Sequence, residues 1–274
     1  MGHPPRPVFT LRRALLVLPL IVFALAAVTL GTRGLSRRFV FPAHRIDAPS
    51  APPDAIAHAL VARDGVAVHA LELEGAPDGW VVVHFHNNRE TVVHAMGAAR
   101  GLSAFGIGVL LVEYRGYGAS RDAEPSEAGL YLDAEAALDM LDRRGTPRDR
   151  ILLWGTSLGT GIAAEMARRG RGAALVLVTP YTSIPDLISD VVPVLPARAL
   201  VADHFDTLSK TAKIKIPTLV IHGDADEIVP FWMGNRIAGA IAGARLVRVS
   251  GGHHGDLFAR EGERLIWEIA RLTR

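Results

Sequence analysis

The 274-residue sequence contains no cysteine, and this absence removes several kinds of chemistry at once. A chain without thiols has no disulfide bonds, no thiolate metal ligands and no cysteine nucleophile. The chain also has little net charge, because 30 basic residues nearly balance 28 acidic ones and leave a formal charge of +2. Such a balance argues against a nucleic-acid-binding protein, and we expect no nucleic-acid partner.

Nucleotide-binding patterns are absent or incomplete. The Gly-Lys-Ser/Thr of a phosphate-binding loop does not occur in the sequence. Residues 159–164 match G-x-G-x-x-A, but a dinucleotide site also needs an acidic residue after the next strand. The corresponding stretch, LVLVTPYT at 175–182, contains none. We therefore favour another role for this glycine cluster, with nucleotide binding and a purely structural turn as the alternatives.

One long hydrophobic run lies near the N-terminus. Residues 14–31, ALLVLPLIVFALAAVTLG, carry no charge, and arginines flank both ends. The length is at the lower limit for a membrane-spanning helix, and a secretory signal peptide has the same layout. We expect a basic tail at 1–13 and a single-pass anchor at 14–31, or a secreted protein if the segment is a cleaved signal peptide. The short basic N-terminus favours a folded domain outside the cytoplasm.

The rest of the chain is expected to form a linker and one large domain. Proline and alanine are frequent at 42–55, which predicts a linker over 32–54. Hydrophobic residues make up 49% of the sequence, enough for a sizeable core in a domain spanning 55–274. A segment at about 180–213 is too short for a separate cap domain, and we interpret it as a short lid.

Hydrophobic patterns predict the order of elements in this domain. A hairpin that turns at Asp64-Gly65 is followed by repeated strand–helix units. The expected later strands are residues 80–86, 108–114, 150–154, 173–179, 217–223 and 244–250, and the expected helices are 91–104, 127–142, 158–169, one after 230, and 256–272. This order predicts an α/β fold with a mostly parallel sheet, helices on both faces and an antiparallel first strand. In such sheets, functional residues lie just after the strands.

A serine follows the strand expected at 150–154. The five residues Gly155 to Gly159 read GTSLG and match the pattern G-x-S-x-G. A serine between a strand and a helix takes a strained turn, and the flanking glycines allow close approach of the chain. The turn exposes the Ser157 hydroxyl and places the Leu158 N–H at a helix N-terminus, where a developing oxyanion would be stabilised.

A nucleophilic serine needs a base, and the base needs an acid that orients it. Asp224 and Asp226 follow the strand expected at 217–223, and His253 and His254 follow the strand expected at 244–250. Serine, acid and histidine thus occur in the chain order of the α/β-hydrolase arrangement. Position alone leaves either aspartate and either histidine open.

Six motifs together resemble those of one known family. They are FHNNRET (85–91), EYRGYGAS (113–120), GTSLG (155–159), TSIPDL (182–187), IKIPTLVIHGDADEIVP (214–230) and GGHHGDLF (251–258). With these motifs, the chain resembles the membrane-anchored, Bem46-like group of α/β-hydrolase serine hydrolases. The resemblance covers roughly residue 39 to the C-terminus.

The resemblance implies which residues carry the chemistry. Ser157 is then the nucleophile. Asp226 is the acid, because it occupies the family's aspartate in H-G-x-x-D-x-x-V-P, with Asp224 as the alternative. His254 is the base, because a small residue and an aspartate follow it, with His253 as the competitor.

The oxyanion hole shows a departure from the family. The resemblance implies a hole formed by the N–H groups of Leu158 and Asn88, but relatives carry His-Gly-Asn where this chain has His86-Asn87-Asn88. Because asparagine tolerates a left-handed backbone, we expect Asn87 to take the place of the glycine. An asparagine side chain there would add a donor or crowd the substrate.

The resemblance implies hydrolysis of an acyl ester through an acyl-enzyme, with no metal or organic cofactor. We expect a small-molecule or lipid-like ester and the membrane as partners, and the sequence leaves the oligomeric state open. The apolar lid residues are expected to roof an acyl pocket or to pack on the core: Leu187, Ile188, Val191, Val192, Val194 and Leu195. The alternatives are a peptidase or amidase of the same fold, and a catalytically silent, membrane-tethered binding protein.

Overall fold

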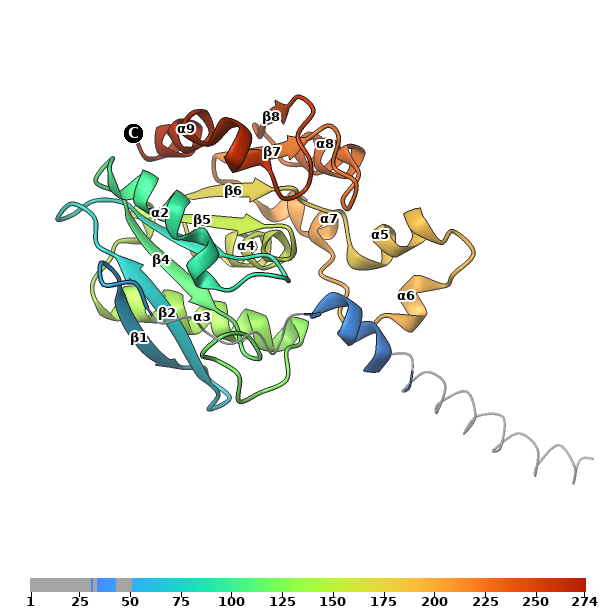
Figure 1. The fold of residues 1–274 in the computed structure, drawn as a ribbon, viewed down its shortest axis with the longest axis horizontal. Coiled ribbons are helices and arrows are strands. Elements are labelled where there is room, and N and C mark those ends of the chain that lie inside the picture. The colour runs from blue at the N-terminus through green and yellow to red at the C-terminus, as the bar shows by residue number, and fades with distance from the viewer. Residues whose placement is uncertain (1–30, 32–33, 43–50) are drawn as a thin grey trace, which may run out of the picture.

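An eight-stranded sheet forms the centre of the molecule (Figure 1). The computed structural model describes residue 31 and residues 34–42 and 51–274, so the expected basic tail lies outside the described residues, as does nearly all of the expected anchor. The strand order is β1-β2-β4-β3-β5-β6-β7-β8. The strands are β1 (Ile56–Val61), β2 (Ala67–Leu73), β3 (Val81–Phe85), β4 (Gly108–Glu113), β5 (Ile151–Thr156), β6 (Ala174–Val178), β7 (Thr218–Gly223) and β8 (Arg245–Val249).

The sheet is antiparallel at one edge and parallel elsewhere. Strands β1 and β2 form the predicted hairpin, whose turn has Gly65 at φ 83°, and β2 pairs antiparallel with β4. All pairs from β4–β3 through β7–β8 are parallel. Strands β4, β6 and β7 are buried along their whole length, as expected for parallel strands covered on both faces.

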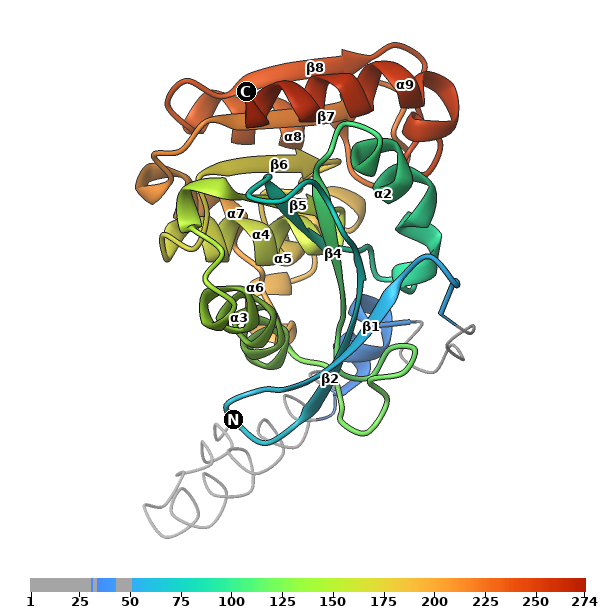
Figure 2. The same cartoon turned by 90° about the vertical axis from the view of Figure 1, so that its left-hand side faces the viewer.

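Helices cover both faces of the sheet, which confirms the predicted α/β architecture (Figures 1 and 2). One face packs against α3, α4 and α8, and the other packs against α2 and α9. The helices are α2 (Met96–Ser103), α3 (Glu127–Arg143), α4 (Leu158–Arg168), α5 (Ile184–Val191), α6 (Ala197–Leu200), α7 (Thr207–Lys210), α8 (Phe231–Ala240) and α9 (Leu257–Ala270). The helix expected over 91–104 begins as a separate 3-10 turn, Val92–Ala95, before α2.

Part of the predicted linker is packed structure. Residues 34–40 are helical, and Phe41 is buried with its ring 6.2 Å from the ring of Phe205. The Arg37 guanidinium donates to Asp203 at 2.9 Å. The linker prediction over 32–54 is therefore too long at this end, because Pro/Ala composition does not reveal a docked segment. No helix within the described ranges is long and apolar enough to cross a membrane.

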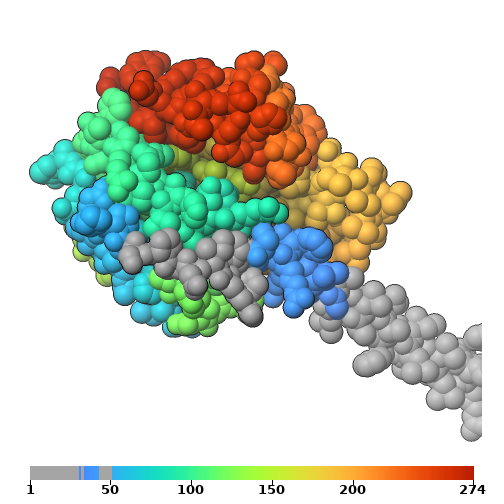
Figure 3. All heavy atoms as spheres, in the orientation of Figure 1, coloured from blue at the N-terminus to red at the C-terminus, as the bar shows by residue number. Residues whose placement is uncertain are grey.

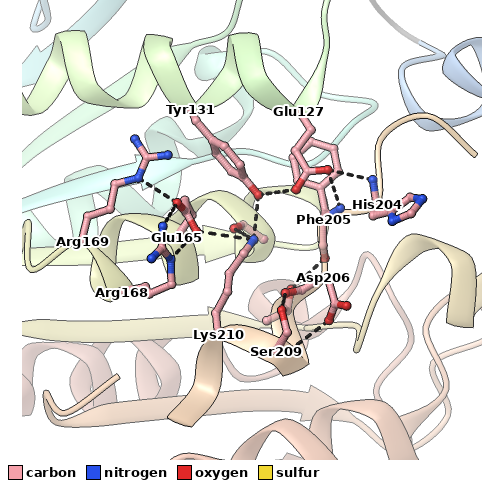
Figure 4. A network of polar contacts seen from close by, with 12 residues as sticks. Glu127, Tyr131, Glu165, Arg168, Arg169, His204, Phe205, Asp206, Ser209 and Lys210 are labelled. Atoms are coloured by element: carbon pink, nitrogen blue, oxygen red, sulfur yellow. Dashed lines mark hydrogen bonds and ion pairs between the residues drawn. The ribbon is translucent and has the colours of Figure 1, made fainter. Parts of the chain in front are cut away.

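A partly buried polar network joins the C-terminal part of the lid segment to the domain (Figure 4). The Glu127 carboxylate on α3 accepts the backbone N–H groups of His204 and Phe205 at 2.7 and 2.9 Å. Lys210 Nζ, at the end of α7, donates to the Tyr131 hydroxyl at 2.7 Å and to the Gly161 carbonyl of α4 at 3.2 Å. These hydrogen bonds attach the C-terminal part of the lid segment to α3 and to α4, the helix that begins next to Ser157.

Candidate active site

Ser157 lies on a strained turn between β5 and α4. Its φ of 50° and ψ of −113° fall where residues with a side chain are rarely found. The Ser157 N–H donates to the Val178 carbonyl of β6 at 2.9 Å, and the Ser157 carbonyl accepts the Thr160 N–H at 2.9 Å. The strain is thus held in place by hydrogen bonds from two neighbouring elements.

The two glycines of the motif permit this turn. A Cβ atom on Gly155 would overlap the carbonyl of Gly159, and a Cβ atom on Gly159 would overlap the carbonyl oxygen of Phe85 at the end of β3. The first turn of α4 therefore approaches both its own strand and the loop after β3. This close approach explains the spacing that the sequence displays around Ser157.

The structure brings Ser157, His254 and Asp226 together. His254 Nε2 lies 3.0 Å from Ser157 Oγ, and His254 Nδ1 lies 2.9 and 3.1 Å from the two carboxylate oxygens of Asp226. A carboxylate at Nδ1 orients the neutral imidazole so that Nδ1–H donates to it and Nε2 accepts the serine hydroxyl. A hydroxyl, an imidazole and a carboxylate in this series can activate a serine.

Asp226 is buried and well supplied with hydrogen-bond donors. Burial by itself raises the pKa of this carboxyl, but hydrogen bonds from His222 and His254 and from the backbone N–H of Val229 outweigh it and hold the pKa well below its usual range. The Ile228 N–H adds a further donor at 2.9 Å. Asp226 therefore stays ionised and able to stabilise a charged His254.

The alternative base, His253, and the alternative acid, Asp224, make other contacts. His253 is half-exposed, and its Nδ1 lies 3.0 Å from the Glu227 carboxylate. Asp224 accepts the Gly251 N–H at 2.6 Å and pairs with Arg248, so it closes the loop after β8. Neither residue has a hydrogen bond to Ser157 or His254 within the described chain.

The two residues expected at the oxyanion hole lie at the start of α4 and in the loop after β3. Helix α4 begins at Leu158, so the Leu158 N–H has no acceptor within its own helix. Asn88 lies in the loop after β3, which the first turn of α4 approaches at Gly159. The Asn88 side chain donates to the Val40 carbonyl at 2.9 Å, so it binds the N-terminal segment.

Asn87 does not take the left-handed backbone expected of a glycine substitute. Four non-glycine residues of the described chain have positive φ, and Asn87 is not among them. Its side-chain oxygen instead accepts the Arg89 N–H at 2.8 Å, an Asx-type turn that asparagine makes readily. The expectation about its backbone was wrong, because a local side-chain hydrogen bond shapes the loop in place of glycine's conformational freedom.

The loop after β3 rests on a buried aromatic layer. The His86 ring stacks on Tyr114 at 4.2 Å between centroids, and the Tyr114 hydroxyl donates to the His86 carbonyl at 3.0 Å. His86 Nε2 lies 3.2 Å from Glu113, and both side chains are almost completely buried. Arg115 is bonded to two carboxylates, Asp64 and Asp133, so it holds neighbouring segments together.

A cavity of about 830 Å³ reaches His254 from the side of α2 and α9. In Figure 3 the surface is hollowed between the green segments near α2 and the red C-terminal segments. Phe105 and Trp267, both about half-exposed, belong to the lining together with Phe258 and Trp154. Sequence reasoning missed these residues, because they lie on separate elements and only the packed sheet brings them to one cavity.

His84 is a buried polar member of the cavity lining. It is 3% exposed, and its ring lies 4.6 Å from that of Trp154. Burial, with a smaller effect from His86, lowers the pKa of His84 to about 3, so the ring is neutral at ordinary pH. A histidine between the apolar residues Val83 and Phe85 was the available sequence signal.

The lid does not roof this cavity. Leu187 and Ile188 pack on the core, whereas four further residues are exposed: Val191, Val192, Val194 and Leu195. None of the six belongs to the cavity lining within the described residues. The cavity is built by α2 and α9 instead.

Metal-binding geometry is not found in the described ranges. No group of three or more histidine, aspartate or glutamate side chains there is arranged to hold a metal ion.

The fold and two sequence profiles match known hydrolases. A profile described as serine aminopeptidase, S33, matches residues 75–205, and one described as TAP-like protein matches residues 200–263. An esterase (EaEST) from Exiguobacterium antarcticum has a TM-score of 0.65 at 20% identity, over 80% of this chain and 99% of that one. The Pyrococcus furiosus esterase Pf2001 has a TM-score of 0.70 at 16% identity, over 83% and 96%. Similarity at these identities shows the fold alone.

Curated relatives are closer in sequence. An uncharacterized Mycobacterium tuberculosis protein is 38% identical over 175 residues, or 63% of this chain, and the match spans only 62% of that relative's length. The α/β hydrolase domain-containing protein WAV2 of Arabidopsis thaliana is 31% identical over 74% of this chain and 73% of its own length. Protein bem46 of Schizosaccharomyces pombe is 32% identical over 62% and 60%. The chain belongs to the Bem46-like group of α/β hydrolases.

Proposed function

We propose that this α/β hydrolase is a serine hydrolase that cleaves an acyl ester. The observation that carries the proposal is the continuous series from Ser157 Oγ through His254 to Asp226, with donor–acceptor distances of 3.0 and 2.9 Å. The strained backbone at Ser157 supports it, because such strain is costly and is concentrated at functional sites.

The proposed reaction is acyl transfer to water in two steps. His254 takes the Ser157 proton as Oγ attacks the ester carbonyl, and the N–H groups of Leu158 and Asn88 bind the oxyanion. His254 then protonates the departing alkoxide, which leaves an acyl-enzyme. Water then attacks the acyl carbon while His254 takes one of its protons. The bond from the acyl carbon to Ser157 Oγ breaks, the carboxylic acid leaves, and His254 gives that proton to Oγ.

The cavity beside His254 favours a substrate with an apolar part. Its lining brings Phe105, Phe258 and Trp267 to the same space as the imidazole. An ester with an aliphatic or aromatic group would bury that group there and gain roughly 25 cal/mol for each Å² of apolar surface removed from water. The proposal also agrees with the two solved structures of this fold named above, both of which are esterases.

A peptidase or amidase is the second candidate. The matching profile is described as serine aminopeptidase, and the cavity lining contains two carboxylates, Glu90 and Glu263. Carboxylates near the scissile bond would attract a substrate's free amine. A panel of acyl esters and aminoacyl anilides, compared by kcat/KM, separates the two candidates.

The direct test of the proposal is covalent labelling of the full-length protein in detergent. A fluorophosphonate should add once, because Ser157 Oγ displaces fluoride from phosphorus, and intact mass reports the adduct. Ser157→Ala should abolish the labelling. Absence of an adduct on folded wild-type protein would contradict the hydrolase and favour a catalytically silent binding protein.

We propose that residues 14–31 anchor the protein in a membrane, with the hydrolase domain on the extracytoplasmic side. Support comes from the uncharged run and its flanking arginines. If residues 14–31 are an anchor, the protein should stay in the membrane fraction after extraction with alkaline carbonate. N-terminal sequencing of the mature protein shows whether the segment has been cleaved as a signal peptide. Release into the supernatant would refute the anchor and leave the secreted form.

A further inference from the structure

The tip of the lid is an unusual stretch of exposed apolar surface. Val191, the last residue of α5, is 76% exposed. In the turn that follows, Val194 is 92% exposed, and Val192 and Leu195 are also exposed. Residues 191–196, VVPVLP, contain no charged or hydrogen-bonding side chain. Apolar side chains gathered in this way in water indicate a surface that contacts something else.

The helical residues 34–40 add to this surface. Leu35 and Phe39 are 55% and 74% exposed, and their spacing of four places them on one face of the helix. The buried Val40 and Phe41 anchor the other side to the domain. Leu35, Phe39, Val191, Val192, Val194 and Leu195 are called the apolar end below.

Contacts hold the two parts of the apolar end at one side of the molecule. Arg37 pairs with Asp203, and Phe41 packs on Phe205, both in the segment that follows α6. Figures 1 and 2 show residues 34–42 and the helices α5 and α6 at the same end of the molecule. In Figure 1 the carboxyl ends of β5 and β6 point toward that end, which is the edge where Ser157 lies.

The chain outside the described residues indicates what covers this surface. The apolar run 14–31 ends only three residues before residue 34, where the described part of the docked segment starts. Three residues of extended chain reach about 11 Å at most. A bilayer that holds the run therefore lies close to Leu35 and Phe39.

We propose that the apolar end is a membrane-docking surface. The lid tip and the exposed face of residues 34–40 enter the interface of the bilayer that holds residues 14–31. Exposed arginines at positions 37 and 38 lie beside the surface and face the lipid headgroups. This inference rests on the proposed anchored hydrolase, and it assigns the substrate to esters of amphiphiles that reside in the membrane.

The absence of cysteine makes a clean experiment possible. A single Val194→Cys substitution gives the full-length chain one thiol, which is labelled with an environment-sensitive nitrobenzoxadiazole fluorophore. The matched control is Val61→Cys, because Val61 is 72% exposed at the end of β1, away from the lid. Both proteins are reconstituted in phosphatidylcholine vesicles with and without nitroxide-labelled phosphatidylcholine.

The proposal predicts blue-shifted emission at position 194 and quenching by the nitroxide lipid several-fold stronger than at position 61. Water-like emission at both positions would overturn it. A blue shift without lipid quenching would also overturn it, because a second copy or the closed lid would then cover the tip. Carbonate extraction and fluorophosphonate labelling of the same vesicles report separately on the anchor and on the activated serine.

Discussion

Among single residues, two adjacent histidines have different roles in the structure. His253 and His254 are adjacent, yet one pairs with Glu227 at the surface and the other joins Ser157 to Asp226. Both histidines lie in the loop between β8, which ends at Val249, and α9, so the loop conformation decides which of the two faces Ser157.

Asp226→Asn tests the acid. The substitution removes the carboxylate that orients His254, and we expect kcat for ester hydrolysis to fall by about three to four orders of magnitude. Asp224→Asn is the matched control, because Asp224 contacts Arg248 and Gly251 instead. Steady-state kinetics of both variants measure the effect, and equal losses in the two would disprove the assignment.

The neutral, buried His84 predicts a pH dependence of stability. Its pKa is lowered by burial to about 3, whereas the unfolded chain binds a proton near 6.5. As the pH falls, the unfolded chain therefore binds a proton at His84 before the folded protein does. The contribution of neutral His84 to the free energy of unfolding is fully present above pH 6.5 and is lost as the pH falls toward 3. Between pH 7 and 4.5 this loss amounts to about 2 to 3 kcal/mol.

His84→Gln should remove that share of the acid sensitivity. Urea unfolding of wild type and variant at pH 7 and pH 4.5 gives the comparison. The wild type is expected to lose more of its unfolding free energy between the two pH values than the variant does. An identical loss in both proteins would mean that His84 titrates normally in the folded state.

Among the elements, the loop after β3 depends on partners that are distant in the chain. Tyr114 and Tyr117 donate to the carbonyls of His86 and Asn88, and the Asn88 side chain donates to Val40. The segment that follows the proposed anchor thereby helps to position an expected oxyanion-hole residue.

Asn88→Ala removes the side-chain bond to Val40 but keeps the backbone N–H. We expect the rate of fluorophosphonate labelling to fall about two- to tenfold, the value of one hydrogen bond. Asn235→Ala, at an exposed position of α8, serves as the control. An unchanged labelling rate in Asn88→Ala would show that Val40 does not position the loop.

Across the whole molecule, the domain extends to residues that the composition assigned to a linker. Phe41 is 1% exposed, whereas Phe39, two residues earlier, is 74% exposed. The same side chain thus has opposite environments within one short segment. The folded unit therefore includes the docked residues before β1.

Phe41→Ala should lower the free energy of unfolding by about 3 to 5 kcal/mol, because it leaves a cavity beside Phe205. Phe39→Ala should change it by less than about 0.5 kcal/mol, as surface substitutions usually do. Denaturant unfolding in detergent gives both values. Similar small effects in the two variants would mean that the segment is not part of the folded unit.

Much of the architecture was predictable from local patterns. The strand–helix order follows from hydrophobic periodicity, which depends only on residues close together in the chain. The G-x-S-x-G motif was recognisable for the same reason, because its five residues are consecutive and a Cβ on Gly155 would overlap Gly159. The second requirement, that Gly159 leave room for the Phe85 carbonyl, comes from a contact far away in the chain. The family resemblance then singled out Asp226 and His254 from their neighbours.

The sequence by itself determined the order of the elements and the residue types available to the site. Only the tertiary structure decided that Asn88 binds Val40, that α2 and α9 rather than the lid line the cavity, and that Phe41 is buried. These outcomes depend on contacts between segments far apart in the chain. Local propensity and composition do not specify such contacts, because burial is a property of the packed whole.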